Sequence, residues 1–155
     1  MRMERAVRTS GKAVVFRDGG VLAVKLHDAE GDYYILPGGG QKAGEVLTDT
    51  VRREVAEETG IAVQPGDAVF VIEGSQGKAF HRVDMVFRCE YLGEANAEKQ
   101  MDAMQVGYEW LPVKTLNHAP LYPSRLRRPI MDLYAGKSTP VYLGNECVGD
   151  AEITD

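Results

Sequence analysis

Alternation of apolar and polar side chains predicts several strands along the chain. From Val21 to His27, every second residue is apolar, which places Leu22, Val24 and Leu26 on one face of a strand. Glycine, proline or short polar runs separate further segments with strand character, namely residues 5–10, 12–17, 33–36, 67–73, 107–111 and 141–143. The residues at 18–20 are typical of a turn, and 28–32 form a polar loop in this prediction.

The longest alternating run extends from Ala79 to Tyr91. Its apolar face consists of Val83, Met85, Phe87 and Cys89. Its polar face consists of Arg82, Asp84, Arg88 and Glu90. The run therefore predicts a strand with one apolar and one polar face.

Helical spacing predicts two helices. In the first, from about Val46 to Thr59, the apolar stripe consists of Leu47, Val51 and Val55, and Gly60 is suited to end the helix. The second begins near Leu126, where Leu126, Ile130, Leu133 and Tyr134 have helical spacing and Pro129 implies a start or a kink. Strands on both sides of a central helix, with a late helix, predict an α+β fold in which helices flank a mixed sheet.

Length and composition indicate one soluble domain over residues 1–155. Hydrophobic residues make up 44% and charged residues 26% of the 155 residues, which argues against disorder. No apolar run approaches the roughly 18 residues that cross a bilayer, and the N-terminal residues lack an apolar core of the signal-peptide type. We therefore expect a cytoplasmic protein with no membrane partner. Cys89 and Cys147 lack the spacing of a zinc site, and Cys89 fits a small buried hydrophobe better than a disulfide partner.

The net charge of −5 disfavours nonspecific binding to nucleic acid, which normally uses a basic patch. We therefore expect no nucleic-acid partner. An acidic cleft could hold a polyphosphate only with cations between the two.

A glycine-rich loop, Gly38–Gly40, precedes three carboxylates on the first predicted helix. Glu54, Glu57 and Glu58 stand at i, i+3 and i+4, and such positions are neighbours on one helix face. The cluster repels itself unless a divalent cation lies against it, and Mg²⁺ prefers carboxylate oxygens together with substrate phosphates. Arg53 precedes Glu57 by four residues, which favours an ion pair that orients the carboxylate.

The segment 39–61 resembles the Nudix box, the signature of the Nudix (MutT-like) hydrolases. The matching residues are Gly39, Glu45, Arg53, Glu54, Val55, Glu57, Glu58, Gly60 and Ile61. Chance agreement at all fixed positions in so short a chain is on the order of one in a million. The resemblance implies a Nudix α/β/α sandwich with a core over about residues 5–135 and a C-terminal extension over about 136–155.

The resemblance also implies a site. Glu57 and Glu58 would be the main ligands of Mg²⁺, for which Mn²⁺ could substitute, and the Gly38 carbonyl would contribute. Glu54 would be a metal ligand or the base that activates water. Arg53 would orient the glutamates, and Glu45 would support the loop or an outer metal.

The sequence does not single out one residue as the general base, and it indicates the substrate contacts less clearly than the metal ligands. The family varies in its base, and Asp102 in the polar stretch before residues 108–110 is a second candidate, although a solvated loop carboxylate explains it too. Gly39 and Gly40 allow the backbone to approach a substrate closely, because they lack a Cβ. Lys25 could reach a phosphate from its strand.

The resemblance implies cleavage of a diphosphate bond in a nucleoside diphosphate linked to another group, such as a (d)NTP, ADP-ribose or a nucleotide sugar. Subgroup markers downstream of the box are absent: residues 74–80 read Gly-Ser-Gln-Gly-Lys-Ala-Phe, without the proline-rich array of NADH-cleaving members. Alternatives are a nucleotide-sensing domain that binds without cleaving, and a tail strand at 141–143 that pairs with a neighbouring chain. A homodimer is possible on this sequence.

Overall fold

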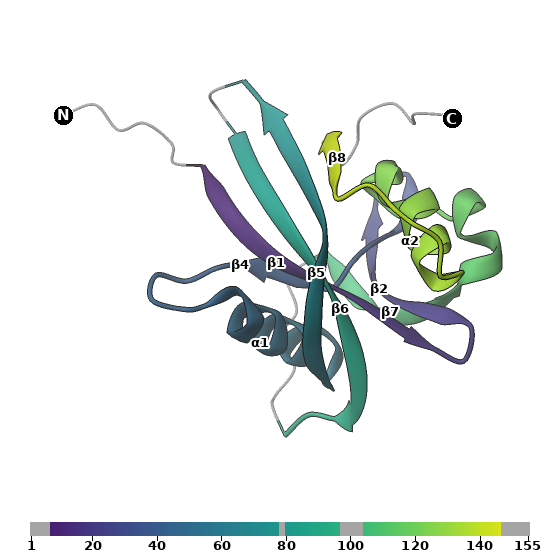
Figure 1. Cartoon of the computed structure of the whole chain (residues 1–155), viewed down its shortest axis with the longest axis horizontal. Helices are drawn as coiled ribbons and strands as arrows, with labels where there is room; N and C mark the ends of the chain where they lie inside the picture. The colour runs from purple at the N-terminus through teal and green to yellow at the C-terminus, as the bar shows by residue number, and fades with distance from the viewer. Residues whose placement is uncertain (1–6, 78–79, 97–103, 147–155) are drawn as a thin grey trace.

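The computed structural model describes residues 7–77, 80–96 and 104–146, and Figure 1 shows strands between two helices. The elements are β1 (Arg8–Arg17), β2 (Gly20–Asp28), β3 (Gly31–Ile35), β4 (Gly38–Gly40), α1 (Leu47–Thr59), β5 (Ile61–Gln76), β6 (Phe80–Glu94), β7 (Gln105–Pro112), the 3-10 helices η1 (Val113–His118) and η2 (Ser124–Leu126), α2 (Arg127–Tyr134) and β8 (Tyr142–Asn145). The predicted α+β class is confirmed.

The strands form a mixed sheet in the order β3-β2-β1-β6-β5-β8, with β4 paired to β1 and β7 paired to β2. β1 runs parallel to β6 over residues 8–15 and turns through Phe16 and Arg17 into an antiparallel pair with β2. β1 therefore connects the two halves of the sheet. Antiparallel pairing of β1 with β4 brings the glycine loop to the same strand.

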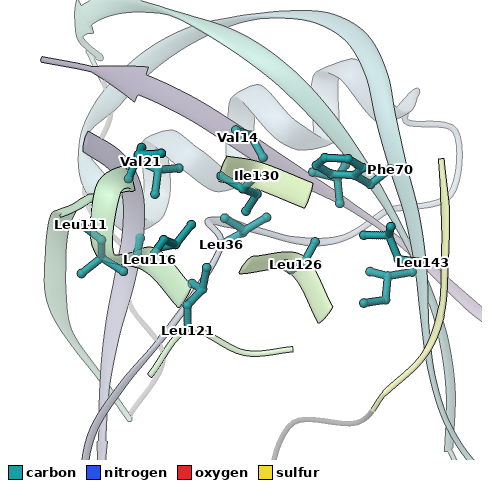
Figure 2. Packing of buried hydrophobic residues seen from close by; sticks show 14 residues of the cluster. Val14, Val21, Leu36, Phe70, Leu111, Leu116, Leu121, Leu126, Ile130 and Leu143 are labelled. Carbon is teal, nitrogen blue, oxygen red and sulfur yellow. The ribbon is translucent and has the colours of Figure 1, made fainter. Parts of the chain in front are cut away.

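Two hydrophobic cores lie on opposite sides of β1. Val15 belongs to the cluster that packs under α1, whereas its neighbour Val14 belongs to the cluster covered by η1 and α2. Figure 2 shows Val14, Phe70 and Ile130 together in the second cluster. Because β1 is buried on both faces, α1 and α2 are fixed on opposite sides of the same strands (Figure 1).

Helix α1 forms where the apolar stripe predicts it. Val51 and Val55 are fully buried against the sheet. Gly60 ends the helix with φ of 72°, in the left-handed region, and donates its N–H to the Ala56 carbonyl. The helix thus holds its acidic residues at a defined place beside β4.

The predicted break between residues 5–10 and 12–17 is wrong over the described residues, because β1 runs through Gly11 without interruption. A Cβ on Gly11 would lie 2.9 Å from Val51 Cγ2, so this glycine allows α1 to pack closely on the strand. The strand predicted at 67–73 is longer, since β5 begins at Ile61 and continues through irregular pairing near Pro65.

The prediction of a polar face on β6 is wrong at Asp84, which is buried. Its side chain is only 3% exposed, because the elements on the α2 side cover that face of the sheet. Cys89 is buried and free, as expected for a small hydrophobe, whereas Cys147 lies outside the described residues.

The predicted strand at 141–143 exists as β8, slightly displaced, and pairs in parallel with β5 of its own chain. The described part of the C-terminal extension thus completes the edge of this chain's sheet. Neither α1 nor α2 has the length and hydrophobicity needed to cross a lipid bilayer, and the described residues contain no other α-helix.

Candidate active site

The glycine loop is a short strand that lies directly on β1. Gly38 pairs with Lys12, Gly39 with Gly11, and Gly40 with Ser10. Gly38 has φ of 143°, and a Cβ there would lie 2.1 Å from the Gly11 carbonyl oxygen. A Cβ on Gly39 would lie 2.5 Å from the carboxyl carbon of Glu54. Gly38 therefore has to be glycine for this backbone to lie on β1, and a side chain at Gly39 would displace the Glu54 carboxylate.

Arg53 connects the loop to three glutamates. Its Nε donates to Glu45 Oε2 at 2.8 Å and its Nη2 donates to Glu45 Oε1 at 3.0 Å. Nη1 donates to Glu54 Oε1 at 3.0 Å and to Glu57 Oε2 at 3.4 Å, which confirms the predicted pairing with Glu57. Nη2 also donates to the Gly40 carbonyl at 3.2 Å. One guanidinium thus orients carboxylates from both the loop and the helix.

The charges of this network stabilise one another. The Arg53 guanidinium, followed by the Thr50 hydroxyl, lowers the pKa of Glu45 to about 2. Glu45 in turn is the main cause that raises the pKa of Arg53. Glu45 is therefore ionised at neutral pH and holds Arg53 in position beside Glu54 and Glu57.

Glu58 occupies a different environment, beneath the glycine loop. It is 5% exposed and accepts the Gly38 N–H at 2.8 Å and the Gln105 Nε2–H at 2.9 Å. Burial raises the pKa of Glu58 to about 7, and the positive charge of Lys12 partly opposes this effect. A carboxylate that is costly to ionise thus lies next to Glu54 and Glu57, which are half-buried.

The structure brings together most of the residues that the box implies. Contacts join Gly38, Gly39, Gly40, Glu45, Arg53, Glu54, Glu57 and Glu58. Lys25 lies on β2, where its ammonium contacts Asp32 at 3.4 Å and Glu109 at 3.3 Å, so its ion pairs are with β3 and β7. Asp102 lies outside the described residues.

Sequence reasoning missed Gln105 and Lys12. Gln105 reaches Glu58 from a strand 47 positions further along the chain, and no local pattern marks such a contact. Lys12 has a weak signal, since it is a charged residue directly before the apolar run at residues 13–16.

The oxygen donors fit a divalent cation chemically, although they are not gathered around a common centre. Within the described ranges, no group of three or more His, Cys, Asp or Glu side chains is arranged to hold an ion. Arg53 holds Glu54 and Glu57, while Glu58 bonds to Gly38 and Gln105. All are hard oxygen ligands of the kind that Mg²⁺ and Mn²⁺ take. The absent Cβ of Gly39 leaves room at the Glu54 carboxylate.

A cavity of about 80 Å³ adjoins the loop on the α2 side of the sheet. Its lining includes Lys12, Ile72, Arg82, Asp84, Tyr122 and Leu126. Lys12 connects the cavity to the carboxylates, because it pairs with Gly38 and acts electrostatically on Glu58. A larger hollow of about 260 Å³ lies at the β1–β2 turn, around Arg17 and Trp110, and none of the box carboxylates lines it.

Comparison with known proteins agrees with the box and the fold. The NUDIX domain model matches residues 8–133, and the chain therefore belongs to the NUDIX family. It is accordingly a hydrolase that acts on phosphoric anhydride bonds. Nudix hydrolases generally use divalent metal ions. No curated protein matches the sequence.

Solved structures show the same fold at low sequence identity. A NUDIX hydrolase from Nitrosomonas europaea superposes with a TM-score of 0.71 at 20% identity, covering 87% of this chain and 93% of that one. A UDP-X diphosphatase gives a TM-score of 0.67 at 18% identity, covering 94% and 70%. An ADP-ribose pyrophosphatase from Streptococcus suis gives 0.62 at 20% identity, covering 91% and 100%. These similarities establish the fold and leave the substrate open.

Proposed function

We propose that this protein is a Mg²⁺-dependent diphosphatase that hydrolyses a nucleoside diphosphate linked to another group. The observation that carries the proposal is the arrangement of Gly38–Gly40 against Glu54, Glu57 and Glu58, with Arg53 bonded to both loop and helix. Phosphoryl transfer needs neutralised phosphate oxygens and a positioned water more than covalent help from the protein. A cluster of carboxylates under a glycine loop is suited to that requirement.

In this proposal Glu54, Glu57, Glu58 and the Gly38 carbonyl hold the metal. Bound Mg²⁺ would neutralise charge on the phosphates and make a bound water more acidic. Arg53 bonds Glu54 and Glu57 through one nitrogen, and its other bonds connect them to Glu45 and to the Gly40 carbonyl. Glu45 fixes Arg53 from the loop side.

As the alternative to metal ligation, Glu54 is the proposed acceptor of the proton from the attacking water. Its Oε1 accepts from Arg53, and the described residues provide no hydrogen bond to Oε2, which leaves that oxygen available. Its side chain is 19% exposed, so water can reach it. Asp102 stays a predicted alternative base.

Lys12 adds a positive charge between the carboxylates and the cavity. Its ammonium makes no hydrogen bond or ion pair within the described part of the chain, and its charge acts on Glu58. We assign it to a substrate phosphate, alongside the backbone of Gly39 and Gly40. Lys25 remains a predicted phosphate contact, and binding there would compete with its ion pairs to Asp32 and Glu109.

The test is release of phosphate or pyrophosphate from canonical and oxidised dNTPs, ADP-ribose, nucleotide sugars and dinucleoside polyphosphates. Each is incubated with Mg²⁺ or Mn²⁺, beside a control with EDTA. Metal-dependent cleavage of one class supports the proposal and identifies the substrate class. Ligand-induced thermal stabilisation with no cleavage of any compound would instead favour a nucleotide-sensing domain.

A further inference from the structure

A buried carboxylate borders the cavity beside the glycine loop. Asp84 is 3% exposed and lies on β6, where it pairs with Ser10 of β1. Its Oδ1 accepts the Ser10 hydroxyl and the Arg82 Nε–H, the latter at 2.7 Å. The described residues give Oδ2 no hydrogen bond, although Asp84 lines the cavity. A ligand that fills the cavity and covers this oxygen has to supply a hydrogen-bond donor to it.

The surroundings of Asp84 suit a flat, mostly apolar ring. Ile72, Val86 and Leu126 supply apolar walls, and Tyr122 supplies an aromatic one. Arg82 gives Asp84 a neighbouring positive charge. The cavity therefore combines hydrophobic walls with one fixed hydrogen-bond acceptor, a common design for selective small-molecule sites.

The cavity also lies at a suitable separation from the proposed phosphate site. Lys12 and Ser10 are two residues apart on β1, and Asp84 stands beside Ser10 in the parallel pairing. Two residues of strand span roughly 7 Å. A nucleotide with its phosphates near Lys12 could thus place its base toward Asp84.

We propose that Asp84 selects nucleotides whose base carries an exocyclic amino group, such as cytosine or adenine. This inference rests on the proposed function, since it places the base of the same substrate in the cavity. An exocyclic amino group in contact with Asp84 Oδ2 donates to it, whereas an exocyclic carbonyl in the same place repels it. The expected difference in affinity is roughly tenfold to a hundredfold, which corresponds to about 1.4–2.8 kcal/mol.

The Asp84→Asn variant should reverse this preference. Arg82 and Ser10 hold the Oδ1 position, and the Arg82 Nε–H requires an acceptor there. The new amide is therefore expected to keep its oxygen at Arg82 and to present its NH₂ group to the cavity. Because Arg82 fixes the amide oxygen, the substitution replaces a hydrogen-bond acceptor at the cavity with a donor.

The experiment compares paired ligands in which an oxo group beside a ring N–H replaces an amino group beside an unprotonated ring nitrogen. These are cytidine and uridine 5′-diphosphates, and adenosine and inosine 5′-diphosphates. Affinities are measured by calorimetry in EDTA, and again with Mg²⁺ in the Glu57→Gln background to prevent turnover. We expect the wild-type site to favour the amino member of at least one pair by tenfold or more. In Asp84→Asn we expect that ratio to fall below one.

Equal affinities within both pairs, or a ratio that Asp84→Asn leaves unchanged, would overturn the inference. So would failure of all four ligands to bind under either condition. If Asp84→Asn does not fold, amide chemical shifts of Ile72 and Val86 in the wild-type protein provide the test. They should move with cytidine diphosphate at concentrations where uridine diphosphate has no effect.

The two proposals fail in different ways. Metal-dependent turnover without discrimination within the pairs would reject the role of Asp84 and retain the hydrolase. Discrimination in EDTA with no turnover of any nucleotide would retain the base site and reject the proposed reaction.

Discussion

In metal-free solution, replacing Glu58 with glutamine should change how the stability of the protein depends on pH. The Glu58 carboxyl is 5% exposed, and burial raises its pKa to about 7 from an ordinary value of 4.5. Between these pH values the folded protein keeps a proton that the unfolded chain has released. Stability from this group is complete below pH 4.5 and is lost as pH rises through about 7.

The size of the effect follows from the two pKa values. Since one pKa unit corresponds to about 1.4 kcal/mol, complete ionisation of Glu58 should cost about 3 kcal/mol of folding free energy. This cost is a large part of the 5–15 kcal/mol by which proteins are typically stable. A divalent cation bound beside Glu58 would offset it, so Mg²⁺ should raise the melting temperature more at pH 8 than at pH 5.5.

The assay is urea denaturation in EDTA from pH 5 to 8.5. The wild-type protein should lose stability over this range relative to Glu58→Gln, which retains an acceptor for the Gly38 N–H and has no proton to release. Glu57→Gln is the matched control, because it removes a carboxylate from the same helix and leaves Glu58 buried, so the pH dependence should persist. Parallel stability curves for wild type and Glu58→Gln would refute the reasoning.

Three further predictions test the surroundings of the site. Gly39→Ala should displace the Glu54 carboxylate and lower turnover about a hundredfold with little change in melting temperature. In a protein that already carries Glu54→Ala, the same substitution should cause no further loss of turnover. Glu146→Ala should lower the free energy of unfolding, measured by urea denaturation, by about 2–4 kcal/mol. Glu146 is 1% exposed and accepts the Ser124 N–H at 2.6 Å and the Ser124 hydroxyl at 2.8 Å. A loss below about 0.5 kcal/mol would contradict this prediction. Burial raises the pKa of Cys89 to about 12, so peptide mapping should find Cys89 unalkylated in native protein at pH 8.

Local spacing explains which features the sequence could predict. The positions of Val51 and Val55 repeat with the helical period, so α1 and its acidic residues follow from neighbours in the chain. Gly60 marks the helix end by its backbone preference alone. Predictions based on periodicity and turn chemistry therefore agree with the structure to within a residue or two for α1.

Features that depend on distant pairing could not be predicted in this way. Asp84 stands in a pattern that gives β6 a polar face, yet elements from the C-terminal half of the chain cover it. Glu58 is buried partly because Gln105 reaches it from β7. The parallel pairings of β1 with β6 and of β5 with β8 leave no local trace in the sequence. The burial and partners of the site residues thus depend on non-local packing, whereas the local pattern is enough to identify most of these residues in the sequence.

The central claim is that the carboxylates of α1 support metal-dependent hydrolysis of a nucleotide diphosphate bond. The most direct measurement is phosphate or pyrophosphate release from the nucleotide panel by wild type and Glu57→Gln, each with Mg²⁺ and with EDTA. We predict EDTA-sensitive cleavage by wild type and a loss of at least about a hundredfold in a correctly folded Glu57→Gln protein. A Glu57→Gln protein that retained most of the wild-type rate on the same substrates would contradict the assignment of this site.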